Sequence, residues 1–371
     1  MANKTIQQIL GYVSLTGVIQ KTKTGIPDNL PAPFQSITKK VLGDAGRYAQ
    51  VVGTRQAARL AMYGAPAVQR RLKDIENVDV KLMHSYESIK MDPLLLQALR
   101  NYDNYDVQQM GIEEVDRQQS EFRRYFDNLR LSAQYSLLAN GSIWFDGSGN
   151  LLTSSSGAKV TISFQVPAGN QNQLNALGAG NIISTSWATA NTDIPKQIRN
   201  LRVAAAQLTG YPLKYAFYGV NVPSYLAPNN YVQEYLSRNV TMSQRWLDQA
   251  EIPDGLFGLT WVPVYTSFID QGQGNDSSPN YQSFFGGDQV IFTPDITREV
   301  YELLEGSYMI PTQFNATADM AAALASLKQV WGMFSYAVPS HNPPTAEMFY
   351  GDTFLPVWKV PLSIFQSTVA F

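Results

Sequence analysis

The stretch "DRQQSEFRRYFDNLRLSAQYSLLANG", residues 116–141, is the second part of the most regular pattern in this 371-residue chain. Apolar residues recur three, four or seven positions apart, which places them on one helical face. They are Ile112, Val115, Phe122, Phe126, Leu129 and Ala133. The pattern predicts a helix over 112–139, about 42 Å long, that ends at Asn140-Gly141. Gln119 interrupts the apolar face, so we expect this face to meet a mixed surface and not a second long helix.

Charged residues on the other faces of this helix stand three or four positions apart, the spacing at which opposite charges meet. The predicted pairs are Glu113 with Arg117, Glu121 with Arg124, and Arg123 with Asp127. Such pairs would explain the charged residues on the polar faces of the helix as structural contacts. The neighbouring carboxylates Glu113 and Glu114 therefore need no acid–base role.

Most of the remaining chain has the patterns of short strands and short helices. Alternation predicts strands over 78–91 and 160–166, and start and stop residues predict helices from Asp92 and from Asp193 to Gly210. "NATADMAAALASLKQVW", residues 315–331, is predicted to be a further helix. "FLPVWKVPLSIF" has the pattern of a strand whose two prolines suit an edge or a bend. The fold class is therefore α+β with one dominant helix.

The first 90 residues differ in character from the rest. "TKTGIPDNLPAPFQS" contains three prolines, which favour an extended arm that orders only against another surface. After a short predicted helix over 55–67, the basic cluster Arg70, Arg71 and Lys73 precedes the strand pattern. We interpret 50–91 as a projecting loop with two arms. An ordinary surface hairpin on a compact domain is the alternative.

Charge is scarce and unevenly distributed. Charged residues make up 16% of the chain, well below the usual quarter, and aromatic residues make up 12%. Such a surface is typical of large subunit interfaces, although a glycan-binding protein could share it. Residues 1–90 carry 13 Lys+Arg and 6 Asp+Glu, whereas the remainder carries 15 and 24. The basic quarter could contact nucleic acid or the acidic body of a neighbouring copy, or simply be a solvated surface.

The search for catalytic chemistry gives no credible site. The chain has no cysteine, which excludes thiolate chemistry and fits a reducing cytoplasm. Its two histidines, His84 and His341, are far apart in the sequence, so a zinc site would need them to converge. "DGSGN" at 146–150 fails as a calcium loop because Leu151 and Gly157 replace the required glycine and acidic ligand. No nucleophile elbow, phosphate loop, signal-peptide core or membrane-length apolar run is found. We expect no enzyme activity, no cofactor and no metal.

The order of these patterns resembles the major capsid proteins of tailed bacteriophages, most closely the phage lambda capsid protein family with its HK97-type fold. The resemblance covers roughly residues 50–371 in element order. It is strongest where "EEVDRQQSEFRRYFDNLRLSAQYSLLANG" is followed by "KVTISFQV" and by "TSWATANTDIPKQIRNL", with Trp187 and Asp193 placed as in the family. "YGVNVPSYLAPNNYVQEYL" and the closing "PSHNPP…FLPVWKVPLSIF" are similar as well. The joint order of these motifs is what identifies the likeness.

The resemblance implies a division of the chain into five parts. They are an N-terminal arm at 1–49, an extended loop at 50–91 that lies over a neighbouring subunit, a peripheral domain at 92–189 with the spine helix 112–139, an axial domain at 190–310, and a return to the peripheral domain at 311–371. The first 50 residues do not align with the lambda pattern. The path of the arm is therefore open.

The function implied is that of a head protein, made in the host bacterial cytoplasm, which assembles into the icosahedral shell of the virion. Implied partners are other copies in pentamers and hexamers, a separate scaffolding protein, a portal, and double-stranded DNA held non-specifically inside. The need for a decoration protein is left open. No membrane contact is expected. An encapsulin-like nanocompartment and a carbohydrate-binding virion protein are the alternatives. The sequence leaves open the triangulation number, the host, covalent cross-linking and N-terminal processing.

Overall fold

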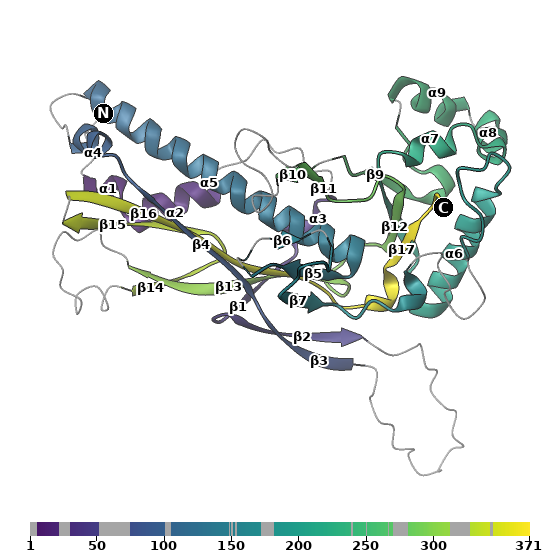
Figure 1. The fold of residues 1–371 in the computed structure, drawn as a ribbon, viewed down its shortest axis with the longest axis horizontal. Coiled ribbons are helices and arrows are strands. Elements are labelled where there is room, and N and C mark those ends of the chain that lie inside the picture. The colour runs from purple at the N-terminus through teal and green to yellow at the C-terminus, as the bar shows by residue number, and fades with distance from the viewer. Residues whose placement is uncertain are drawn as a thin grey trace, which may run out of the picture.

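In the computed structural model of this protein, a long helix runs along a sheet, and a smaller sheet covered by helices lies at one end (Figure 1). The predicted α+β class is confirmed. The structure describes residues 6–21, 30–51, 75–100, 105–147, 149, 151–152, 154–171, 182–238, 240–249, 251–265, 267–269, 281–311, 327–341 and 344–371. The helix predicted over 55–67 lies outside these ranges.

The long helix is α5, Tyr105–Asn140, so the predicted helix is confirmed and begins seven residues earlier. Its first two turns are held by the short helix α4, Pro93–Arg100. At Gly111 a Cβ would lie 3.1 Å from Leu99 Cδ2 of α4, so the two backbones approach closely. Gln108 Nε2 also donates to the Leu99 carbonyl at 3.3 Å. Packing against α4 thus extends the helix through a glycine that a sequence pattern treats as weak.

The C-terminus of α5 follows the prediction. Gly141 has φ +61°, a left-handed conformation that glycine adopts at little cost. Its amide donates to the carbonyl of Leu137 at 2.9 Å, which satisfies an otherwise unpaired carbonyl of the last turn.

Helix α5 packs along a six-stranded sheet that is built around β16, Pro344–Trp358 (Figure 1). Strand β16 pairs antiparallel with β4, β13 and β15. The other strands are β1 Thr38–Val41, β4 Met83–Lys90, β13 Tyr301–Pro311, β14 Leu327–Trp331 and β15 Phe334–His341. The prediction of helix through 327–331 is wrong, because these residues pair antiparallel with the free end of β13.

The N-terminal segment packs against its own chain. Its helices are α1 Ile6–Ile9, α2 Tyr12–Lys21 and α3 Pro33–Ser36. Leu15 and Ile19 of α2 are buried in a core shared with α4, α5 and the end of the large sheet. Thr16 Oγ1 donates to the Ser335 carbonyl of β15 at 2.7 Å and accepts from the Ser335 amide at 3.2 Å. Helix α2 therefore covers the outer edge of β15.

The smaller sheet has the order β17-β12-β8-β9. Its strands are β8 Leu213–Tyr218, β9 Thr260–Pro263, β12 Gln289–Pro294 and β17 Phe365–Thr368. Residues of β8 alternate between two cores: Tyr215 and Phe217 join the main core, while Ala216 and Tyr218 join the core beneath α6, Ile194–Thr209. Because each of its faces is buried in a different core, this sheet joins the main core to the core beneath α6.

Short elements complete the described chain. They are α7 Val222–Leu226, α8 Asn230–Ser237, α9 Val240–Gln249, β5 Ser142–Phe145, β6 Leu151–Leu152, β7 Val160–Ser163, β10 Ser267–Ile269, β11 Tyr281–Ser283 and the 3-10 turns Ala168–Asn170, Leu256–Gly258 and Pro361–Ser363. In the part of the chain that the structure describes, no helix is long and apolar enough to cross a membrane.

Candidate assembly site

A hairpin of β2, Ala45–Val51, and β3, Ile75–Lys81, runs away from the body of the molecule (Figure 1). Residues of β2 are alternately exposed and buried, so one face of the hairpin packs on the body. Tyr48 carries this contact: it is buried in the main core, and burial raises its pKa to about 12. The other face is left exposed on the part of the hairpin that the structure describes.

The base of the hairpin is held by close backbone contacts. A Cβ on Gly46 would lie 2.9 Å from Leu304 Cδ1, and a Cβ on Gly306 would lie 2.7 Å from Leu82 Cδ1. At the base the Leu82 amide donates to the Asp44 carbonyl at 2.7 Å, and at the opposite end of β2 the Val51 amide donates to the Lys359 carbonyl of the body, also at 2.7 Å. These contacts fix the direction in which the hairpin leaves the body.

Past Leu82 the chain continues into β4, so the hairpin is continuous with the large sheet. His84 marks this junction. Its Nδ1 lies 2.7 Å from Thr353 Oγ1, and its ring stacks on Tyr308 with a centroid distance of 5.1 Å. Burial lowers the pKa of His84, and the nearby carboxylates of Asp352 and Asp44 only partly offset this effect.

A buried ion cluster joins the spine helix to the sheet beside that junction. Arg130 of α5 donates to both oxygens of Asp352 in β16, at 2.6 and 2.7 Å, and to Glu305 of β13 at 3.2 Å. Asp352 is fully buried. Burial opposes the charge on Arg130, but the two carboxylates outweigh it and raise its pKa. The helix and two strands are thereby held in one arrangement.

The basic cluster Arg70, Arg71 and Lys73 lies outside the described residues, between the ends of β2 and β3. Two exposed charges on the described part of the hairpin, Arg47 and Asp79, are paired across it. Arg47 Nε donates to Asp79 Oδ1 at 2.6 Å, and this hydrogen bond lowers the pKa of Asp79. The sequence pattern did not reveal this pair, because it depends on the register of β2 against β3.

Of the predicted pairs on the spine helix, Arg123 with Asp127 is confirmed at 2.9 Å. The other two are wrong. Arg117 instead binds both oxygens of Glu114, where a three-residue spacing gives a two-pronged contact. Glu121 accepts from the hydroxyl of Tyr125 at 2.9 Å, one helical turn away.

No group of three or more His, Asp or Glu side chains within the described ranges could hold a metal ion. His84 is engaged at the hairpin junction, as described above. The arrangement around it consists of packing contacts, stacked rings and closed ion pairs. It serves to hold strands in place.

No protein-family model and no curated protein matches the sequence. Solved structures do show likeness. A phage-related protein from Bordetella bronchiseptica RB50 is 10% identical, with 97% of this chain and 98% of that chain covered and a TM-score of 0.49.

The mature capsid of bacteriophage PhiM1 is 11% identical, with coverages of 94% and 89% and a TM-score of 0.43. An encapsulin from Synechococcus elongatus PCC 7942 is 8% identical, with coverages of 94% and 92% and a TM-score of 0.40. These likenesses are loose, and the function proposed below depends on the chain's own elements.

Proposed function

We propose that this chain is the major capsid protein of a tailed bacteriophage, which self-assembles into the icosahedral shell enclosing the DNA genome. The observation that carries the proposal is the β2–β3 hairpin. It projects from the body on a base fixed by Gly46, Gly306 and the Leu82 amide. A hairpin that leaves a rigid body in a fixed direction is suited to reach a neighbouring subunit.

The remainder of the molecule has the properties that such a subunit needs. A closed shell places one chain in several slightly different environments, so its body must be rigid while its contacts extend outward. Helix α5, bound through Arg130 to Asp352 and Glu305, supplies that rigidity. The element order, with a spine helix, a projecting hairpin and a second sheet, is the order that the capsid resemblance implies.

On this proposal the chain is a structural protein of the virion and not an enzyme. Residues 1–49 are the arm, 50–91 the extended loop, 92–189 and 311–371 the peripheral domain, and 190–310 the axial domain. Its partners are other copies in pentamers and hexamers, a scaffolding protein and a portal. Packaged double-stranded DNA lies inside the shell. Synthesis takes place in the host bacterial cytoplasm.

Negative-stain microscopy combined with light scattering of the expressed protein tests the proposal. Shells, hexamers or pentamers are expected. A 41 kDa monomer with a measurable catalytic activity would contradict it. Shells that hold an enzyme cargo instead of DNA would support the encapsulin-like nanocompartment, and a monomer that binds glycans would support the carbohydrate-binding alternative.

The basic cluster Arg70, Arg71 and Lys73 has a specific role in this proposal. We infer that it contacts the acidic body of a neighbouring copy, because residues 1–90 carry a net charge of +7 and the remainder −9. Replacing all three residues by alanine should reduce assembly and particle stability. Lys81→Ala, at the exposed end of β3, is the matched control. If the triple variant assembles as well as this control, the cluster has no such role.

A further inference from the structure

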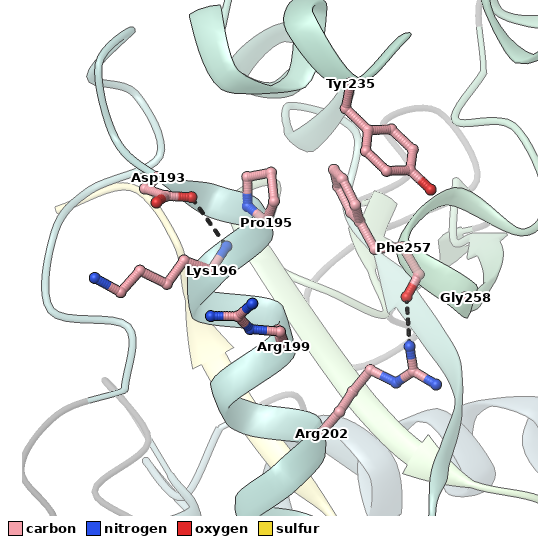
Figure 2. Close-up of a pocket in the computed structure, with 8 residues that line it drawn as sticks. All are labelled: Asp193, Pro195, Lys196, Arg199, Arg202, Tyr235, Phe257 and Gly258. Carbon is pink, nitrogen blue, oxygen red and sulfur yellow. Dashed lines mark hydrogen bonds between the residues drawn. The ribbon is translucent and has the colours of Figure 1, made fainter. Parts of the chain in front are cut away.

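A pocket of about 520 Å³ opens in the region of the smaller sheet (Figure 2). Three cations, Lys196, Arg199 and Arg202, line it from α6 at intervals of three residues. The rings of Tyr235 and Phe257, whose centroids lie 5.2 Å from each other, form the other side, and the ammonium group of Lys196 points away from them. Asp193, Pro195 and Gly258 complete the lining.

The wall opposite α6 is fixed in place. Phe257 has φ +57° and Gly258 has φ +72°, and a left-handed conformation is strained for phenylalanine. Arg202 Nη1 donates to the Phe257 carbonyl at 2.8 Å, and a Cβ on Gly258 would lie 2.7 Å from the same nitrogen. Arg202 therefore holds the turn, and with it the Phe257 ring, against the pocket.

The other two cations are available to a ligand. Lys196 and Arg199 are exposed, and neither forms an ion pair with any residue that the structure describes. The carboxylate of Asp193 caps α6 by accepting the Lys196 amide at 3.0 Å, so it is already engaged with the backbone. Two cations without an ion pair, and the single carboxylate of Asp193, thus line the α6 side of the pocket.

The positive pocket is unusual for its surroundings. Residues 190–310 contain 7 Lys+Arg and 12 Asp+Glu, and three of the seven cations line this one pocket. The rest of the region is therefore strongly acidic. A second copy of the chain carries the same excess of acidic residues, which is opposite in charge to the cations of this pocket.

The rim of the pocket favours a protein partner over a nucleic acid. Tyr235, which lines the pocket, is 40% exposed, and further apolar or aromatic side chains are exposed on the same two helices, Val203 of α6 at 52% and Tyr231 of α8 at 44%. Exposed tyrosine and arginine beside apolar side chains are typical of protein interfaces. A phosphate backbone would use the cations and leave this apolar rim uncovered.

We propose that the pocket receives an acidic surface segment of a second copy, with carboxylates on Lys196 and Arg199 and an apolar side chain against Tyr235 and Phe257. This proposal rests on the shell function proposed above. A ring of identical subunits joins two different surfaces of each copy, head to tail. A basic pocket and an acidic segment elsewhere on the same chain meet this requirement, because the two surfaces differ and each can bind the other on a neighbouring copy.

Because the chain has no cysteine, Tyr231→Cys provides a unique thiol for a photocrosslinker at the rim. Shells assembled from mixed light and heavy-isotope subunits should yield crosslinks between copies that join this site to an acidic peptide of the same chain. The dissociated variant should yield none. Crosslinks confined to one copy, or crosslinks to nucleic acid, would overturn the proposal.

A charge-neutralised pair of variants tests the cations directly. Lys196→Gln with Arg199→Gln should lower the yield of shells at least tenfold while circular dichroism of the unassembled protein stays unchanged. Lys214→Gln, an exposed cation of the same region that is paired with Asp295, is the matched control and should assemble normally.

The outcomes separate the two proposals. If the unaltered protein forms shells and the double variant forms them equally well, the pocket proposal fails and the shell function stands. If the double variant assembles normally but loses binding of a labelled oligonucleotide, the pocket binds nucleic acid and the proposal is also overturned. If the unaltered protein forms no assembly, it is the shell function that fails.

Discussion

Arg130 on the spine helix binds both carboxylate oxygens of Asp352 on the central strand, at 2.6 and 2.7 Å, in a site where Asp352 is fully buried. Arg130→Met would leave a buried carboxylate without its cation. We expect a loss of about 3–5 kcal/mol in the free energy of unfolding, measured by urea denaturation of the unassembled protein. Lys214→Met, which removes an exposed ion pair, should change it by less than about 1 kcal/mol. Equal effects of the two variants would contradict the structural role of Arg130.

Gln119 lies in the apolar face of the spine helix and is fully buried. Among the described residues neither polar atom of its side chain has a hydrogen-bond partner. Gln119→Leu should therefore raise the free energy of unfolding by about 1–2 kcal/mol, because a buried unpaired amide costs more than the apolar side chain that replaces it. Thermal unfolding is the measurement. Arg124→Leu, on an exposed face of the same helix, should give no such gain, and a decrease for Gln119→Leu would show that the amide is satisfied.

His84 predicts a pH dependence at the base of the hairpin. Its pKa in the folded protein lies below the ordinary value, so the folded state binds fewer protons than the unfolded state. The stability that it contributes is present above about pH 6.5 and is lost as the pH falls through the lowered pKa. The protection factors of the β4 amides, which are exchange rates corrected for the intrinsic pH dependence of exchange, should therefore fall as the pH drops below about 6.5.

His84→Gln should remove this loss of protection, whereas His341→Gln should retain it. Two carboxylates face His84 and oppose its shift, those of Asp352 and Asp44. Their own protonation at lower pH is common to both variants, so the comparison isolates the imidazole. An unchanged pH dependence in His84→Gln would assign the effect to the carboxylates.

Where a few neighbouring residues determine the structure, the sequence was a sufficient guide. The predicted start and end of α6 are confirmed: Asp193 accepts the Lys196 amide, and Gly210 has φ +80°. The C-terminal prolines also follow expectation. Pro356 lies where β16 pairs with β13 alone, since pairing with β4 ends at Phe354, and Pro361 begins a 3-10 turn.

Where distant segments decide, the sequence was insufficient. Residues 327–331 have helical spacing, but their pairing with β13 makes them a strand. The pocket beside α6 depends on the left-handed turn at Phe257, which no local pattern indicates. A signal for it was nevertheless present, since Lys196, Arg199 and Arg202 stand three residues apart on one helix.

The face around Gln119 was predicted to meet a mixed surface, and it does. Val115 and Phe126, on the same face, pack in a core with residues of α1, α2, α4, β15 and β16. Three short helices and the end of a sheet take the place of a second long helix. The polar residue in the stripe thus distinguished correctly between a coiled coil and a composite core.

The contact between Thr16 and Ser335 gives a test of how firmly the N-terminal segment is held. The hydroxyl of Thr16 satisfies both the carbonyl and the amide of Ser335 at the edge of β15. Thr16→Val keeps the shape but leaves both backbone groups unpaired, which should weaken docking of α2 by about 1–3 kcal/mol. Proteolysis within residues 6–21 and exchange of the Ser335 amide should then be roughly ten- to hundredfold faster, since about 1.4 kcal/mol corresponds to a factor of ten. Thr16→Ser keeps the hydroxyl and should behave as the unaltered protein. If the valine and serine variants exchange at the same rate, apolar packing of Leu15 and Ile19 alone holds the segment, and the edge of β15 needs no hydroxyl to cover it.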